Sequence, residues 1–412
     1  MITKPKGCYD LYKEESKLYR KIEDVVNAYM HVYDYKYIRT PLFESSELFK
    51  RGVGETTDIV QKETYDFIDR SGRNMTLRPE GTAGVVRSYI ENKVYGENIA
   101  VSKNYYMGTM YRYERPGLGR NREFTQFGVE VFGSDDSLID AEVISLSVNV
   151  LKQLGIDANV VINNLGSVED RENYKNALVE YLRPHIGTLC EDCQKRFETN
   201  PLRILDCKID GDKDILKGAP SILNYQSTES SERFKKVLEY LDYLDIDYEI
   251  DNTLVRGLDY YDYMVYELKT EDSLALGGGG RYNHLVSELG GPVTPAVGFA
   301  CGVERIINIL KEKDAEQDSI DVFILAVNDE EKMKANILMQ DLRLNGLSCE
   351  TDYLQKGLKG QFKDADKYGA KLLLILNSDD LNLGMVTIKD NVTKEEQKVA
   401  EDEIIDYIVG MV

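Results

Sequence analysis

Short strand-like segments dominate the first part of the chain, and few helical patterns lie between them. These segments span residues 63–67, 75–77, 99–102, 105–113, 123–131 and 158–163. A parallel doubly wound sheet would show strands alternating regularly with helices, and this chain does not. The pattern therefore predicts an antiparallel sheet in an α+β domain.

Apolar spacing indicates where helices flank the predicted sheet. Residues 17–32 place Leu18, Ile22, Val25, Val26 and Tyr29 on one helical face. A strand over 35–40 ends before Pro41, because proline is confined to strand ends and edges. Further helices are expected at 142–154 and 303–313, and further strands at 248–255 and 263–268.

Changes in this pattern divide the chain into regions. Residues 1–166 and 246–313 are expected to form two parts of one α+β core, separated by a mainly helical insertion at 167–245. The polar stretch 314–320 is interpreted as a linker. Residues 321–412 are expected to form a compact α/β domain, because two buried-strand runs there are separated by helical stretches.

Composition restricts the class of protein. A chain of 412 residues is long enough for two or three domains, and its net charge of −21 favours a small-molecule enzyme over a nucleic-acid binder. No apolar run is long enough for a membrane span, and the N-terminus lacks the apolar core of a signal peptide. The six cysteines suit a reducing cytosol, so we expect a cytoplasmic protein.

The richest motif is an arginine-containing hairpin at residues 110–130. Because alternate side chains share a strand face, it groups Arg112 with Glu114, and Phe124 with Gln126, Gly128 and Glu130. The connecting loop carries Arg115, Arg120 and Arg122. Such a loop can close on a polyphosphate while an aromatic ring stacks on a base. A hairpin with a solvated cationic tip is the alternative, but charge on a core-lining face is costly unless a ligand neutralises it.

Two other segments carry candidate polar groups. Residues 254–261, LVRGLDYY, place Arg256 beside a glycine and two tyrosines in an apolar, strand-like context, which suits stabilisation of a carboxylate or phosphate. Glu80 and Thr82 follow a strand and can both accept hydrogen bonds from an ammonium group. The alternatives are an arginine in a surface salt bridge and a turn with a helix N-cap at Thr82.

Glycines mark two further segments. Residues 277–280 are four glycines, which permit close approach of the backbone to a ligand or form a flexible turn. They are not a P-loop, because the Gly-Lys-Ser/Thr ending is missing. Residues 295–305 are interpreted as an apolar strand and a helix whose first turn holds Arg305, aimed at an anion or paired with Glu304.

The predicted insertion contains a possible metal motif, H-x4-C-x2-C-x13-C. Its members are His185, Cys190, Cys193 and Cys207, which are all potential zinc ligands. Cysteines are also common as small buried residues. No metal is therefore firmly assigned.

Together these segments resemble the signature motifs of class II aminoacyl-tRNA synthetases. The helix and strand ending at Pro41, the arginine hairpin, and the glycine strand with Arg305 correspond to the three general motifs. LVRGLDYY and LGGGGRY are similar to two elements peculiar to histidyl-tRNA synthetases. The resemblance spans nearly the whole chain and implies a catalytic core, 1–166 and 246–313, with an anticodon-binding domain at 321–412.

The resemblance also implies roles for the candidate residues in ATP binding. Arg112 would contact the α-phosphate, and Arg120 and Arg305 the terminal phosphates. Phe124 and Glu114 would hold the adenine. ATP would enter with Mg²⁺ as a substrate, and no tightly bound cofactor is expected.

The same resemblance implies a histidine pocket. Glu80, Thr82 and Gln126 would bind the ammonium and carboxylate groups, Glu130 and Tyr261 would bracket the imidazole, and Tyr260 and Tyr282 would line the pocket. Arg256 would stabilise the pentavalent phosphorus as the histidine carboxylate attacks ATP. Arg256 and Arg112 are thus the expected catalytic residues.

The implied partners are L-histidine, ATP, tRNA(His) and a second copy of the chain. The predicted C-terminal domain has 11 Lys and Arg against 18 Asp and Glu, so its charge does not by itself predict RNA binding. Lysines 356, 359, 363, 367 and 371 nevertheless have helical spacing. Two alternatives are a non-catalytic regulatory subunit of ATP phosphoribosyltransferase and a synthetase for another amino acid. The arginines and the two histidyl-type elements argue against both.

Overall fold

The computed structural model describes residues 1–55, 57–98, 100–117, 119–207, 209–211, 213–313 and 319–411. The chain forms two compact units, Met1–Lys313 and Asp314–Val412. Among the described residues, no helix combines the length and the apolar character needed to cross a membrane.

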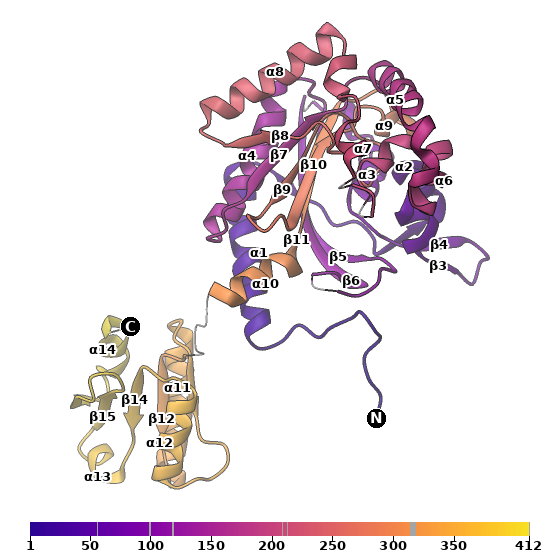
Figure 1. Ribbon diagram of the computed structural model, residues 1–412. Coiled ribbons are helices and arrows are strands. Elements are labelled where there is room, and N and C mark those ends of the chain that lie inside the picture. The colour runs from indigo at the N-terminus through magenta and orange to yellow at the C-terminus, as the bar shows by residue number, and fades with distance from the viewer. Residues whose placement is uncertain are drawn as a thin grey trace. The chain divides into compact units, whose positions relative to one another are not determined.

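The first unit is built on an eight-stranded sheet (Figure 1). Neighbouring strands are antiparallel except at the two ends, where β1 pairs with β5 and β7 with β8 in parallel. This confirms the predicted antiparallel α+β class. In spatial order the strands are β1 (Lys36–Tyr37), β5 (Ser102–Tyr111), β6 (Glu123–Phe132), β11 (Ala296–Gly302), β10 (Ala275–Arg281), β9 (Asp262–Lys269), β7 (Asn159–Asn164) and β8 (Tyr248–Ile250).

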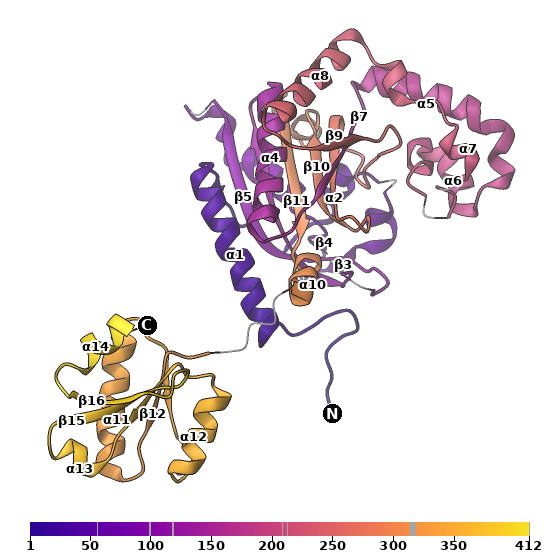
Figure 2. The ribbon, with the colours of Figure 1, turned by 60° about the vertical axis from the view of Figure 1, so that its left-hand side comes forward.

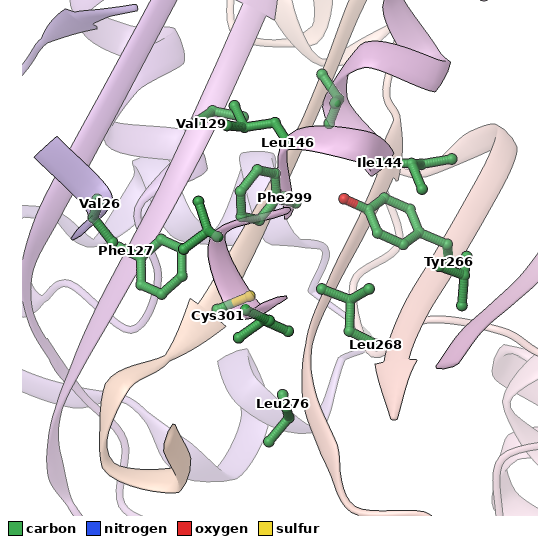
Figure 3. Packing of buried hydrophobic residues seen from close by; sticks show 14 of the residues in the cluster. Val26, Phe127, Val129, Ile144, Leu146, Tyr266, Leu268, Leu276, Phe299 and Cys301 are labelled. Atoms are coloured by element: carbon green, nitrogen blue, oxygen red, sulfur yellow. The ribbon is translucent and has the colours of Figure 1, made fainter. Parts of the chain in front are cut away.

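Amphipathic helices pack with one face of this sheet to form the main core. Phe127 of β6 and Phe299 of β11 meet edge to face with ring centroids 6.1 Å apart, in the same cluster as Val26 and Leu146 (Figure 3). Burial of this apolar surface is the main force holding the helices in place. They are α1 (Glu14–Val32), α4 (Ser137–Gln153), α8 (Thr228–Tyr243) and α10 (Val303–Lys313).

A second apolar cluster joins other strand side chains to α3 (Thr82–Glu91) and to the helices between β7 and β8. Among these, α5, α6 and α7 lie close together (Figure 2). Before α8, which packs in the main core, the segment contains α5 (Val168–Leu182), η3 (Arg183–Thr188), α6 (Glu191–Thr199), η4 (Pro201–Ile204), α7 (Asp214–Lys217) and η5 (Ile222–Tyr225). The described part of the segment is thus helical, as expected, and its treatment as a separate insertion domain stays a prediction.

Smaller elements complete the first unit. A three-stranded antiparallel sheet has the order β2-β4-β3. The remaining elements are β2 (Phe43–Ser45), α2 (Ser46–Val53), η1 (Ile59–Glu63), β3 (Tyr65–Ile68), β4 (Asn74–Leu77), η2 (Val94–Gly96) and α9 (Leu285–Glu288).

The second unit has its own five-stranded sheet and apolar core. Strands β12 and β14 are the two buried runs predicted from the sequence, while the antiparallel strands β15 and β16 were not predicted. The elements are β12 (Val322–Leu325), α11 (Asp329–Leu344), β13 (Cys349–Thr351), α12 (Leu358–Lys367), β14 (Leu372–Ile375), α13 (Ser378–Leu381), β15 (Met385–Asp390), β16 (Glu396–Ala400) and α14 (Ile404–Met411).

Several local predictions were wrong. The flexible turn considered for 277–280 is instead strand β10, hydrogen-bonded to β9 and β11. Residues 254–261 form a loop before β9 rather than a strand, although Leu254 and Val255 are buried. Strand β5 begins at Ser102, so 100–101 are not strand, and Ile99 lies outside the described residues. Most of the expected linker, 314–318, also lies outside them.

Candidate active site

One face of the large sheet borders a cavity of about 940 Å³. Side chains of β6 alternate between this cavity and the helix-covered core on the other face. The cavity brings together side chains from the turn before α3, the β5–β6 hairpin, the loop before β9, and α10. The candidate residues that line it are Glu80, Thr82, Arg112, Glu114, Arg120, Phe124, Gln126, Glu130, Arg256, Tyr260, Tyr261 and Arg305. Tyr282 is not among the lining residues and lies behind one of them, Glu130.

The Glu130 carboxylate is the most deeply buried acidic group of the cavity, with 1% of the residue exposed. Its Oε1 accepts hydrogen bonds from the Thr82 hydroxyl at 2.7 Å and the Tyr106 hydroxyl at 3.4 Å. Its Oε2 accepts a hydrogen bond from the Tyr282 hydroxyl. Burial raises the pKa of Glu130 to about 8, against the effect of these hydroxyl donors, and the nearby Glu80 charge adds to the rise.

Tyrosine rings surround this carboxylate and exclude water from it. Tyr260 and Tyr261 are buried with ring centroids 4.6 Å apart, and Tyr260 meets Tyr282 at 5.5 Å. Burial raises the pKa of all three phenols. They therefore remain neutral hydrogen-bond donors. We call the space between them the tyrosine slot: the tyrosine rings form its apolar sides, and Glu130 and the tyrosine hydroxyls provide its polar ends.

Glu80 and Gln126 provide further hydrogen-bond acceptors in the same cavity. The Glu80 carboxylate accepts from the backbone N–H groups of Thr82 at 2.6 Å and Ala83 at 2.9 Å, so it occupies the N-terminus of α3. Thr82 bonds Glu130 through its hydroxyl and is the first residue of α3 rather than its N-cap. Gln126 Oε1 is buried and has no hydrogen-bond partner within the described part of the chain.

Three arginines gather at the hairpin side of the cavity. Arg112 Nη1 and Arg120 Nε lie 3.8 Å and 3.9 Å from the Glu114 carboxylate, and Arg112 Nε donates to the carbonyl of Pro79 at 2.8 Å. Burial and then the charges of Arg120 and Arg112 lower the pKa of Arg305. This positive charge exceeds what Glu114 neutralises, so the cluster suits a polyanion.

Arg305 does not pair with Glu304, its neighbour on α10. Its guanidinium donates to the carbonyls of Gly119, at 3.4 Å, and Ala275. Glu304 instead accepts from the backbone N–H of Thr125 and the hydroxyl of Tyr9, both at 2.7 Å. The first turn of α10 thus directs the two side chains to different partners.

Arg256 lines the cavity and lies against Gly278 of β10. Its Nη1 pairs with the Glu267 carboxylate of β9, whose charge raises the pKa of Arg256 against the opposite effect of burial. A methyl group at Gly278 would come within 2.9 Å of this Nη1, so a residue without a side chain is needed beneath it. Arg256 Nε is buried with no hydrogen-bond partner among the described residues.

Sequence reasoning did not identify three acidic or hydroxyl groups in contact with these residues. Glu267 orients Arg256, Tyr106 donates to Glu130, and Glu63 lines the cavity beside the hairpin. Burial and the charge of Glu114 raise the pKa of Glu63. Each lies in a segment that the sequence predicts as a strand, which does not distinguish it from its neighbours.

Comparison with protein families agrees with this arrangement. The family model described as histidyl-tRNA synthetase matches residues 7–306, and the model described as an anticodon-binding domain matches residues 321–411. The chain belongs to the histidyl-tRNA synthetase family. The family resemblance noted from the motifs is therefore confirmed.

Similar proteins named histidine--tRNA ligase match almost end to end. The chain is 47% identical to the one from Bacillus cytotoxicus, over 99% of this chain and 98% of that one. It is 46% identical to the one from Anoxybacillus flavithermus, over 98% of both chains. The crystal structure of apo S. aureus histidyl-tRNA synthetase superposes with a TM-score of 0.83 at 38% identity, covering 99% of this chain and 100% of that one.

The regulatory alternative is not favoured by these matches. A structure described as an ATP phosphoribosyltransferase regulatory subunit/histidyl-tRNA synthetase from Bacillus halodurans has a TM-score of 0.69 at 23% identity, which establishes a shared fold alone. The histidyl-tRNA synthetase relatives above match over both units of the chain at about twice that identity.

Proposed function

We propose that the chain activates L-histidine with ATP and transfers it to tRNA(His). In the first step the histidine carboxylate attacks the α-phosphorus of ATP, forming histidyl-adenylate and releasing pyrophosphate. In the second, a hydroxyl at the 3′ end of the tRNA attacks the carbonyl carbon and AMP leaves. The observation that carries this proposal is that one cavity contains a polar-ended tyrosine slot, an arginine cluster, and Arg256 held against Glu267 of β9 and Gly278 of β10.

In this proposal the tyrosine slot binds the imidazole of histidine. Glu130 accepts a hydrogen bond from one ring nitrogen, and the Tyr261 hydroxyl faces the other. Because Glu130 is buried and hydrogen-bonded to Thr82 and Tyr282, it cannot turn away to water. An analogue that lacks a ring nitrogen would leave a buried polar group unpaired, so it would be strongly rejected.

The backbone groups of histidine fit the acceptors beside the slot. The unpartnered Gln126 Oε1 and the Glu80 carboxylate are suited to the ammonium group. Two backbone N–H groups already use part of the Glu80 carboxylate, but its two oxygens retain further acceptor capacity. Thr82 holds Glu130 in place through its hydroxyl.

ATP fits the arginine side of the cavity. Arg112 would bind the α-phosphate, Arg120 and Arg305 the terminal phosphates, and Phe124 with Glu114 the adenine. The mutual repulsion of the arginines is relieved when an anion binds between them. Bidentate guanidinium contacts then fix the phosphates for in-line attack.

Arg256 would act on the charge that develops at the α-phosphorus. Glu267 fixes one side of the guanidinium, and the unpartnered Nε and remaining N–H groups are available to phosphate oxygens. A pre-oriented cation in a largely buried site stabilises the pentavalent transition state without reorganisation. The enzyme contributes positioning and electrostatics, with no covalent enzyme intermediate.

Mg²⁺ is expected to accompany ATP as part of the substrate. Nucleotide-bound Mg²⁺ uses one or two protein carboxylates and keeps several waters. Glu63 lines the cavity beside the arginine cluster, where burial and the charge of Glu114 raise its pKa. It fits this role, in which the ion neutralises phosphate charge.

We also propose that two copies associate and that the C-terminal unit contacts tRNA in the cytoplasm. Large apolar side chains on the first unit's surface suit a second copy: Tyr37, Phe43, Phe67 and Ile68 are 41–70% exposed. The six cysteines are free thiols, which suits a reducing compartment. Light scattering of the wild type and of Ile68→Asp tests association, because a buried new charge separates the copies.

Histidine-dependent exchange of pyrophosphate into ATP tests the proposed activation step. Purified chain with Mg²⁺ should exchange pyrophosphate with histidine and not with phenylalanine or glutamine. Charging of tRNA(His) then tests the transfer step. Folded protein that shows no exchange with histidine would overturn the proposal, whereas exchange without charging would overturn the transfer step alone.

A further inference from the structure

A compact group of three thiols and a carboxylate lies in the helical segment between β7 and β8. Cys190 is the N-cap of α6 and Cys193 lies in its first turn, while Cys207 and Asp210 follow η4. One potential ligand atom from each residue lies within 4.8 Å of all the others. Cys193, Cys207 and Asp210 are buried, and Cys190 is half-buried.

The distances in this cluster suit a tetrahedral metal ion better than a covalent bond. Cys190 Sγ and Cys207 Sγ are 3.7 Å apart, far beyond the bond length of about 2.05 Å in a disulfide. Two sulfurs bound tetrahedrally at about 2.3 Å from one Zn²⁺ would be about 3.8 Å apart. The Asp210 carboxylate oxygen is 4.0 Å from Cys207 Sγ, close to the value of about 3.5 Å for a shared zinc.

Backbone groups are already arranged around the sulfurs. The backbone N–H of Cys193 donates to Cys190 Sγ, and the backbone N–H groups of Ile209 and Asp210 donate to Cys207 Sγ. Such N–H donors are the outer contacts that orient and stabilise metal-bound thiolates. The loop at Asp210 is fixed by its carboxylate, which accepts from the N–H of Cys190 at 2.8 Å.

The charges around the cluster also favour a bound cation. Three thiolates and a carboxylate cannot all be ionised together in a buried site without a cation to neutralise them. Zn²⁺ would leave a net charge of about −2 on the complete ligand set. Lys213 lies 2.7 Å from Asp210, and the charge of Arg196 interacts with Cys193 and Cys207, so part of this charge is offset.

The fourth ligand differs from the one that the sequence motif suggested. His185 does not belong to the cluster, and Asp210 takes its place. The spacing H-x4-C-x2-C made His185 a candidate ligand. In the structure His185 lies in η3, and the centroid of its ring is 6.2 Å from that of Tyr181. The ligand set is therefore C-x2-C-x13-C-x2-D.

We propose that Cys190, Cys193, Cys207 and Asp210 bind one Zn²⁺ as a closed structural site. Four protein ligands leave no open position for a substrate or a reactive water, so the ion has no direct catalytic role. Its effect is to tie the start of α6 to the chain after η4, in a segment whose backbone hydrogen bonds are local among the described residues.

This site would stabilise one wall of the substrate cavity. Between the paired cysteines and Cys207, Arg196 and Arg203 bind the Asp58 carboxylate at 2.9 Å and 3.2 Å. Asn200 donates to Asp259 at 3.0 Å, in the loop that carries Arg256. Loss of the metal would loosen these contacts and lower activity without removing any group that touches the substrates.

Metal analysis of the full-length chain tests the proposal directly. Protein expressed with added zinc and purified without chelator or metal-affinity resin should contain about one Zn²⁺ per chain. A mercurial that captures the thiols should release this zinc stoichiometrically to an indicator dye. Replacing zinc with Co²⁺ should give the visible absorption bands of a tetrahedral cobalt thiolate.

Variants identify the ligands. Cys193→Ser with Cys207→Ser should lose at least nine-tenths of the zinc, roughly the tenfold or greater loss expected when ligands are removed. Asp210→Asn should bind it more weakly. His185→Gln and Cys349→Ser should retain full zinc content, because neither residue belongs to the cluster.

Two results would overturn the proposal. One is folded wild-type protein that contains no zinc and gives no cobalt thiolate absorption on reconstitution. The other is a cysteine double variant that keeps its full zinc content, which would place the metal elsewhere. If the double variant fails to fold, the zinc-release and cobalt measurements on the wild type decide the question.

Discussion

Gly298 lies directly against the Glu130 carboxylate: a methyl group at this glycine would come within 2.1 Å of Oε2. The two residues are paired across β6 and β11, so the backbone cannot move aside without disturbing the sheet. The buried carboxylate, which forms one end of the tyrosine slot, therefore has room only because residue 298 on the neighbouring strand has no side chain.

Gly298→Ala should accordingly damage both folding and histidine binding. We expect a loss of about 1–3 kcal/mol in the free energy of unfolding, as for other overpacked cores. The displaced carboxylate should also raise the KM for histidine at least tenfold while leaving the KM for ATP nearly unchanged. Denaturant unfolding and pyrophosphate exchange measure the two effects.

Gly96→Ala is the matched control, because a methyl group there meets no atom within 4 Å among the described residues. It should change neither quantity. Equal effects of the two substitutions would show that the contact between Gly298 and Glu130 is unimportant.

Glu130 should make the stability of the ligand-free protein depend on pH. Its pKa is about 8 in the folded protein against 4.5 ordinarily, so between these values the unfolded chain has lost a proton that the folded chain keeps. The contribution of Glu130 to the free energy of unfolding is thus fully present below about pH 4.5. It falls by about 1.4 kcal/mol per pH unit between about pH 4.5 and about pH 8. Glu130→Gln should remove this slope.

Denaturant unfolding of wild type and variant at about pH 5.5 and pH 7.5 measures the difference. Glu123→Gln, on the same strand, should keep the slope of the wild type. Parallel pH dependences for wild type and Glu130→Gln would contradict the burial effect. In exchange assays at about pH 8 and above, where Glu130 is ionised, Glu130→Gln should also raise the KM for histidine, since a carboxamide is a weaker acceptor for an imidazole N–H than a carboxylate.

Arg256→Ala should reduce the exchange rate by about 10²–10³-fold, the usual cost of removing a preorganised charge-stabilising group. The KM values for histidine and ATP should change little, because the proposed contact strengthens in the transition state. Removal of Arg256 also leaves the partly buried Glu267 with Lys269, at 3.3 Å, as its remaining cationic partner among the described residues. The double variant Arg256→Ala, Glu267→Gln separates these effects, since recovered activity there would attribute the loss to Glu267 instead of Arg256.

The sequence predicted those parts of the site that follow strand periodicity. Phe124, Gln126 and Glu130 share the cavity side of β6 because alternate residues face opposite sides, while Phe127 and Val129 enter the helix-covered core. The arginine hairpin was recognisable because charge alternates with apolar residues along it. These patterns are local, so one strand and its turn are enough to reveal them.

Other features depend on contacts that sequence patterns do not record. Gly277 and Gly278 have low intrinsic strand preference, and their place in β10 follows from close packing of the backbone under Arg256 and against Cys301. Leu254 and Val255 are buried like strand residues but belong to a loop. Asp210 could not be distinguished among the 72 acidic residues until folding placed it beside the thiols.

Lys359 and Lys363 should contribute to tRNA binding by the C-terminal unit. Both are exposed, Lys359 in the first turn of α12 and Lys363 one turn later, and no carboxylate among the described residues pairs with either. Lys367, on the same helix, lies 3.4 Å from Asp364, and Lys371 lies 2.8 Å from Asp321, so their charges are partly neutralised. Of the lysines with helical spacing, the unpaired ones are thus best suited to phosphates.

Lys359→Ala with Lys363→Ala should raise the KM for tRNA(His) severalfold and leave histidine-dependent exchange unchanged, since activation does not involve the RNA. Each lost phosphate contact should also reduce the slope of log affinity against log salt by about 1. Lys367→Ala, the paired control on the same helix, should have a smaller effect on both. An unchanged salt slope in the double variant would show that this face of α12 does not contact tRNA, whatever the net charge of the unit.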